Sequence, residues 1–190
     1  MKILVLIVMA AISGACGLRA AEPANEALRN AMLGKTVDPS FSNTVASAQA
    51  GDANAQIGLG NVFADGLYSV PQNDAEAFLW YERAARAGNS LGEFIVASFY
   101  EQGRGVARNE AQALAWYKLS AGQGFARAQA ALGRIYASGQ GVAKDPIEAY
   151  KWLSLAAAAG DNSAGAERLK LAETMSLQDV AEGEYRTGSF

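Results

Sequence analysis

The chain has 190 residues, which is enough for one domain with a sizeable core and a short appendage. Its 16 basic and 19 acidic residues give a formal charge of -3. Nucleic acid and anionic membranes attract concentrated Lys and Arg, so neither is an expected partner. There is no histidine, which removes the commonest general base and metal ligand, and the single cysteine is Cys16. We therefore expect no cofactor, no metal site and no catalytic centre.

Residues 1–21 have the order of a secretory signal peptide: Lys2 near the start, an apolar run at residues 3–12, and small residues from Ser13 onward. The apolar run is too short to span about 30 Å of hydrocarbon as a helix. Removal of residues 1–21 takes away Lys2 and Arg19, which leaves 14 basic residues against 19 acidic ones and a charge of -5. We expect an exported protein, periplasmic or secreted, whose mature form has no transmembrane span.

Cys16 offers a second way to process this leader, so the cleavage site stays open. Gly14 and Ala15 precede it as in a lipobox, although Ser13 stands where such boxes normally carry Leu, Val or Ile. Lipidation at Cys16 would anchor the protein to the outer membrane instead of releasing it. Ordinary cleavage is the leading expectation, and the lipoprotein is the alternative.

Residues 22–50 predict a helix at 22–33 and a half-repeat that closes the N-terminal end of an array. Pro39 and a polar run separate the two. Residues 47–52 match the end of the second helix in the repeats that follow.

Three units of about 36 residues come next, which we assign to residues 51–87, 88–123 and 124–159. Equivalent tryptophans stand 36 residues apart at Trp80, Trp116 and Trp152. A period of this length indicates stacked supersecondary units, each of which buries its apolar face only against its neighbours. Because the tryptophans recur at one repeat position, we interpret them as core residues and not as a binding stripe.

Each unit predicts two helices. The first has apolar residues at i, i+3 and i+4, and its interior holds Gly60, Ala97 or Gly133 at one equivalent position. A glycine inside a helix costs about 1 kcal/mol, so we expect the backbone of the partner helix to approach closely there. The second helix begins with a capping box, formed by Asn73 with Glu76, Asn109 with Gln112, and Asp145 with Glu148.

Residues 160–190 predict a fourth first helix, which runs to about Thr174, and a short closing helix. Ser176, with Asp179 three residues later, would cap that closing helix. The expected fold class is therefore all-α, a stack of helix pairs with a C-terminal capping helix.

The three units share a detailed pattern: Ala-x-x-x-Leu-Gly-x-x-Tyr, then Gly-x-Gly-Val, then Ala-x-x-Trp-Tyr-x-x-Ala-Ala-x-x-Gly. This pattern, which covers residues 51–160, resembles the SEL-one-like repeat (SLR) family, relatives of the tetratricopeptide repeats. Ser120 and Leu153 depart from it without threatening the fold. The resemblance implies a right-handed α-solenoid of helix-turn-helix repeats that holds a protein or peptide in a groove. It implies no catalytic residues, and the family branch with hydrolase activity depends on repeat cysteines that this sequence lacks.

If the first helices line the concave face, as in the tetratricopeptide relatives, the variable positions of those helices form the groove. Asp65 and Glu101 are then solvated charges at helix ends and not a general acid and base. The expected groove residues are Asn54, Ile57, Asn61, Asp65, Phe94, Ser98, Glu101, Gln102, Arg127, Arg134 and Ser138.

The leading hypothesis is a non-catalytic exported scaffold that binds a protein or peptide in the bacterial envelope. One alternative is a cell-envelope hydrolase that acts on peptidoglycan or lactams, and another is a lipid-anchored structural protein attached through Cys16. The sequence indicates neither the partner nor the oligomeric state.

Overall fold

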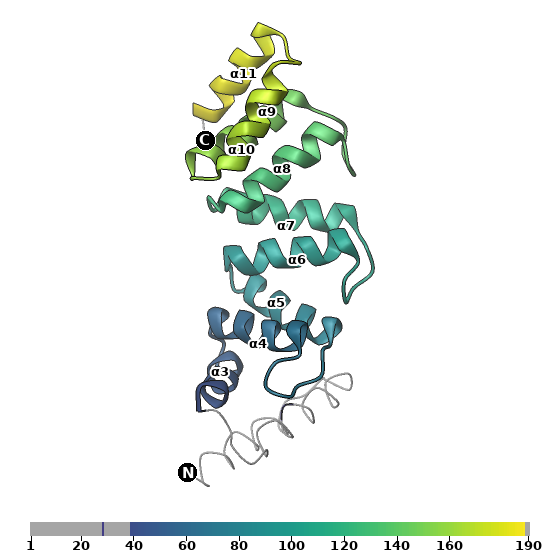
Figure 1. Cartoon of the computed structure of the whole chain (residues 1–190), viewed down its shortest axis with the longest axis vertical. Coiled ribbons are helices and arrows are strands. Elements are labelled where there is room, and N and C mark those ends of the chain that lie inside the picture. Colours follow the sequence, from purple (N-terminus) through teal and green to yellow (C-terminus); the bar gives the residue numbers. More distant parts are fainter. Residues whose placement is uncertain (1–27, 29–38, 189–190) are drawn as a thin grey trace. The chain divides into compact units, whose positions relative to one another are not determined.

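The computed structural model describes Leu28 and residues 39–188. The expected signal peptide, Cys16 and, apart from Leu28, the expected helix at 22–33 lie outside these residues. Every regular element of the described part is an α-helix (Figure 1). The helices are α3 (Pro39–Gln49), α4 (Ala53–Asp65), α5 (Asp74–Arg86), α6 (Ser90–Gln102), α7 (Glu110–Gly122), α8 (Ala126–Ser138), α9 (Pro146–Ala158), α10 (Asn162–Ala172) and α11 (Leu177–Gly188).

The chain forms two compact units, which divide after Ala87. In unit 1, α4 packs against both α5 and α3. In unit 2, which begins at Gly88, α6 packs on α7, α7 on α8 and α8 on α9, while α10 and α11 both pack on α9. Within each unit, helices that follow one another from α3 to α5 and from α6 to α10 are packed in sequence, and α11 returns to α9, which is the arrangement of α-solenoid repeats. The predicted fold class is confirmed.

The second helix of each repeat begins at the predicted N-cap. Asn73, for example, accepts hydrogen bonds from the backbone N–H groups of Ala75 and Glu76 at 3.1 and 3.2 Å. The backbone N–H of the N-cap itself donates to a carbonyl near the end of the first helix, at 2.8 to 2.9 Å. The pairs are Asn73 with Phe63, Asn109 with Tyr100, and Asp145 with Tyr136.

This last hydrogen bond corrects the predicted capping box. In a full box, the N3 side chain would accept the N-cap N–H. Here that N–H joins the second helix to the first, which leaves the N3 side chain available elsewhere. Glu148, for instance, forms ion pairs with Lys151 and Arg186, each at 3.0 Å.

The interior small residue of the first helix admits a side chain of the second helix. At Gly133 the backbone approaches as well, as expected, because an added Cβ would lie 3.3 Å from the backbone nitrogen of Leu153. A Cβ added at Gly60 would lie 2.5 Å from a ring carbon of Tyr81. A Cβ added at Gly133 would lie 2.6 Å from Cγ of Leu153. The predicted close approach of the second helix at this glycine is confirmed. The space that the glycine leaves is filled by an aromatic or aliphatic side chain.

The tryptophans belong to the core, as predicted, although not equally. Trp80 and Trp152 are 7% and 6% exposed. Trp116 is only half-buried and packs against the edge of the core cluster of unit 2. Recurrence at one repeat position therefore predicts packing well, even where one copy stays partly open to solvent.

The array closes at α11, which lies on α9. Ser176 caps this helix by accepting the N–H of Asp179 at 3.1 Å, as predicted. Gly183 of α11 sits against the ring of Tyr150, where an added Cβ would come within 2.7 Å of Cδ1. Arg186 joins Glu148 of α9 at 3.0 Å. The predicted C-terminal capping helix is thus held on α9 by a close contact, an ion pair and a hydrogen bond from the Tyr150 hydroxyl to Glu184 Oε1 at 3.4 Å.

Replacement of Gly133 by Ala tests the close approach to Leu153. The added methyl overpacks this contact, so we expect the free energy of unfolding to fall by about 1–3 kcal/mol. Gly165→Ala is the matched control, because its Cβ would meet only Ala157 Cβ, at an ordinary 3.7 Å. That control should gain up to about 1 kcal/mol from helix propensity. Urea unfolding of both variants measures the two changes in the free energy of unfolding. Equal changes would contradict the close approach between Gly133 and Leu153.

A pH titration of stability tests the buried carboxyl of Glu93 in α6, which is 4% exposed and accepts a hydrogen bond from Gln123 Nε2 at 2.7 Å. Burial raises the pKa of Glu93, and the Gln123 hydrogen bond opposes that rise. The folded state therefore binds more protons between the ordinary and the raised pKa, and the contribution of Glu93 to stability is lost as pH rises through that window. Glu93→Gln removes this loss.

We accordingly expect the stability of Glu93→Gln relative to the unmodified protein to increase between pH 4 and pH 7. Urea unfolding at several pH values measures this difference. A difference that stays constant with pH would show that burial does not shift this carboxyl.

Candidate functional site: a cavity on unit 2

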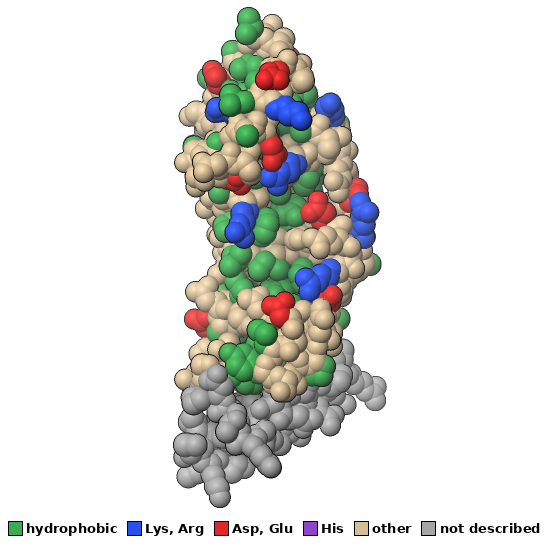
Figure 2. All heavy atoms as spheres, in the orientation of Figure 1, with side chains coloured by type: hydrophobic (Ala, Val, Ile, Leu, Met, Phe, Trp, Pro, Cys, Tyr) green, Lys and Arg blue, Asp and Glu red, His purple; other side chains and the backbone are tan. Residues whose placement is uncertain are grey.

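Unit 2 contains a cavity of about 430 Å³, open to solvent, to which α6, α7 and α8 contribute side chains together with the N-cap of α10. Figure 2 shows hydrophobic side chains gathered over α6, α7 and α8, with basic and acidic side chains beside them. The cavity is lined by Phe94, Glu101, Tyr117, Arg127, Ala130, Ala131, Arg134, Ile135, Ser138, Gln140 and Asp161.

Three aromatic rings form the apolar part of this region. The ring of Phe94, which lines the cavity, lies 5.7 Å from that of Tyr117 and 5.3 Å from that of Phe125. The interplanar angles are 52° and 56°. Tilted pairs at such separations are favourable aromatic contacts. Phe94 is thus held between two rings while staying partly exposed.

Phe125 occupies the N-cap position of α8 and breaks the local rule for that position. The equivalent residues Asp52, Asn89 and Asp161 all cap their helices through side-chain oxygens. Phe125 makes no such bond, and the loss of a polar cap costs about 1 kcal/mol. Departures from local rules concentrate at functional sites, and here the departure supplies the ring that supports Phe94.

Most charged groups at the cavity already form hydrogen bonds or ion pairs within the protein. The Tyr117 hydroxyl donates to Glu101 Oε2 at 2.7 Å, and burial, followed by the nearby carboxylate, raises the pKa of Tyr117. Asp161 caps α10 and accepts from the Ser163 hydroxyl at 2.6 Å, which lowers the pKa of its carboxyl.

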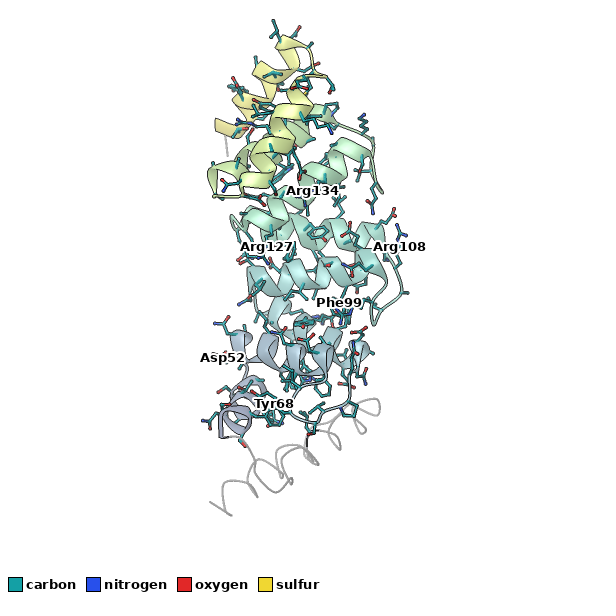
Figure 3. The ribbon with its side chains drawn as sticks, viewed as in Figure 1. Asp52, Tyr68, Phe99, Arg108, Arg127 and Arg134 are labelled. Atoms are coloured by element: carbon teal, nitrogen blue, oxygen red, sulfur yellow. The ribbon has the colours of Figure 1, made fainter. Side chains whose placement is uncertain are left out.

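The two arginines of the cavity both lie on α8 (Figure 3). They differ in their pairing. Arg134 holds Glu167 of α10 with two parallel hydrogen bonds, Nε to Oε2 at 2.9 Å and Nη2 to Oε1 at 2.8 Å. Hydrogen bonding to Glu167 raises the pKa of Arg134. Arg127 is exposed and makes no hydrogen bond or ion pair with any residue that the structure describes.

The structure brings five of the expected groove residues together in this cavity: Phe94, Glu101, Arg127, Arg134 and Ser138. Two other residues of α6 take no part in it, because Gln102 Nε2 donates to Ser98 Oγ at 2.8 Å and neither side chain lines the cavity.

In unit 1, the expected groove residues all lie on α4, in unlike settings. Ile57 is 7% exposed and belongs to the core of that unit. Asn61 accepts a hydrogen bond from the Tyr81 hydroxyl at 2.7 Å. Asn54 and Asp65 are exposed. Their role in a groove stays a prediction.

The residues of the cavity that the sequence did not indicate are Tyr117, Ala130, Ala131, Ile135, Gln140 and Asp161. Tyr117 directly follows the recurring Trp116, a position that indicates packing in the core, and Ala130 and Ala131 carry no chemical signal of their own. Phe125 had a usable signal, since it stands where the other first helices begin with Asp or Asn.

Two negative findings concern the described residues alone. Among residues 39–188, no three His, Cys, Asp or Glu side chains gather where they could hold a metal ion. No helix within that part of the chain has both the length and the apolar character needed to cross a membrane.

The chain is similar to two solved structures. One is a Sel1 repeat protein from Oxalobacter formigenes, with 35% sequence identity and a TM-score of 0.64, over 69% of this chain and 98% of that one. The other is a protective antigen present in uropathogenic Escherichia coli strains, which displays an SLR fold. It shares 24% identity and a TM-score of 0.68, over 96% of this chain and 43% of that one, which shows likeness of fold alone. No curated protein matches the chain.

The Sel1 repeat model matches residues 53–89, 90–125 and 126–161, which together make up more than half of the chain. These segments coincide with the helix pairs α4–α5, α6–α7 and α8–α9. The resemblance found in the sequence is therefore confirmed, and the chain belongs to the Sel1 repeat family.

Proposed function

We propose that this protein is a non-catalytic scaffold of the bacterial envelope, which binds a segment of another protein or peptide in the cavity of unit 2. The observation that carries the proposal is the convergence of five variable repeat positions on one open cavity beside a partly exposed aromatic ring. Stacked helical repeats typically present such surfaces to partner chains. Partly exposed aromatic rings with polar groups around them are also common at the centre of protein interfaces.

The acidic residues of the cavity support binding more than turnover. Glu101 accepts the Tyr117 hydroxyl and Asp161 caps α10, so both carboxylates serve the fold. Acid–base catalysis needs two titrating groups whose pKa values are separated by their different environments. Both groups must also reach the substrate. The hydrolase alternative gains no specific support from this arrangement.

A variant that fills the cavity tests the proposal. Ala131→Phe adds a ring to the half-buried lining of the cavity, while Ala115→Phe adds the same ring at an exposed position of α7 outside it. Peptides selected from a display library on the full mature chain should bind Ala131→Phe at least about tenfold more weakly, as expected for loss of a central contact. They should bind Ala115→Phe normally.

Affinities from fluorescence anisotropy, with thermal unfolding to confirm that both variants fold, provide the comparison. Equal binding to the two variants, or failure of the library to yield any saturable binder, would contradict the proposal.

Export by ordinary cleavage is the second part of the proposal, supported by the basic, apolar and small residues of the first 21 positions. Intact-mass spectrometry of the mature protein should show a free, unacylated N-terminus that begins between positions 16 and 22. A mass that includes a lipid on Cys16 would favour the anchored alternative instead. Retention of residues 1–21 would contradict export.

A further inference from the structure

We propose that the cavity of unit 2 selects peptides in which a large apolar side chain lies next to an acidic one. The apolar side chain would pack on Phe94 and Ile135, and the side-chain carboxylate would pair with Arg127. This inference rests on the proposed function and adds the chemical class of its ligand.

The shape of α8 provides room for such a ligand. Arg127 and Arg134 are seven residues apart, or about 10 Å along the helix at 1.5 Å per residue, so they share one face. Between them, the lining consists of Ala130 and Ala131, the smallest side chains with a Cβ. Two long arginines thus border a short apolar stretch, and the ring of Phe94 lines the same cavity.

The pairing of charges decides which ligand fits. Four charged residues line the cavity, and three are engaged: Glu101 by Tyr117, Arg134 by Glu167, and Asp161 by Ser163 and the first amides of α10. Arg127 has no counter-charge among the described residues. An acidic ligand gains an ion pair with Arg127 without breaking any of these contacts. A basic ligand would have to share Glu101 or Asp161 with Arg134, whose charge interacts with both carboxylates.

One unpaired guanidinium suits one side-chain carboxylate, which sits against a single planar fork of donors. The net charge of the chain is -3, so general electrostatic attraction favours basic peptides over acidic ones. Preference for an acidic peptide would therefore report the local site and not the overall field of the protein.

The probes are short peptides, acetylated at the N-terminus and amidated at the C-terminus so that side chains carry their only charges. Each contains Leu or Phe beside Glu, Gln or Lys, and binding to the full mature chain is measured by fluorescence anisotropy. We expect Glu peptides to bind about five- to tenfold more tightly than their Gln counterparts, as for one charge-assisted hydrogen-bonded pair. Lys peptides should bind more weakly than either.

Three variants separate the roles of the arginines. Arg127→Gln should abolish the preference for Glu over Gln while leaving Gln peptides bound. Glu167→Gln releases Arg134 and should increase the affinity for Glu peptides further. Arg108→Gln is the matched control, because Arg108 pairs with Glu110 at the other end of the helix pair and does not line the cavity (Figure 3).

The outcomes distinguish this inference from the proposed function. Suppose that binding is saturable and is weakened by Ala131→Phe. The inference is then overturned, and the binding role left intact, if Glu peptides are not preferred or if Arg127→Gln has no more effect than Arg108→Gln. Absence of binding by every probe, together with an empty library selection, would overturn both.

Discussion

The architecture depends on the contact between the interior small residue of each first helix and a large side chain of the second helix. Gly60 meets Tyr81, and Gly133 meets Leu153; Ala97 and Tyr117 occupy the equivalent positions and share one buried cluster. A second connection, from the N-cap N–H to a carbonyl of the first helix, fixes the start of the second helix. Because both connections recur, each repeat is held internally before it stacks on a neighbour.

This constraint determines which residues remain for function. Tyr117 fills the space beside Ala97, and its hydroxyl therefore emerges beside Glu101, where it occupies that carboxylate. Arg134 is similarly occupied, because Glu167 of α10, the next first helix of the array, lies within reach of its guanidinium. Among the charged and aromatic residues that line the cavity of unit 2, the fold leaves Arg127 and the exposed part of Phe94 unused. The binding properties that we infer thus come from side-chain groups that the packing of the repeats does not use.

The sequence predicted the parts of this molecule that repeat. Period, caps and core positions such as Trp152 follow from local chemistry that recurs three times, and the structure agrees with them. The partners of individual side chains were not predictable in the same way. That Glu167 pairs with Arg134 depends on contact between helices of neighbouring repeats, and that Ser98 and Gln102 bind each other depends on the side-chain conformations within α6. Phe125 was predictable only in part. The sequence shows that it replaces the polar N-cap of the equivalent helices, but it does not show the contact with Phe94.

Hydrogen–deuterium exchange of the full mature chain, with and without a saturating blocked peptide that contains Leu beside Glu, tests the central claim most directly. A ligand in the cavity should slow exchange in the segments that line it, residues 94–101 of α6 and 127–138 of α8. Amides of α11 and of unit 1 should exchange at unchanged rates, because neither contributes to the cavity. Protection confined to α11 or to unit 1, with none in α6 and α8, would contradict the account.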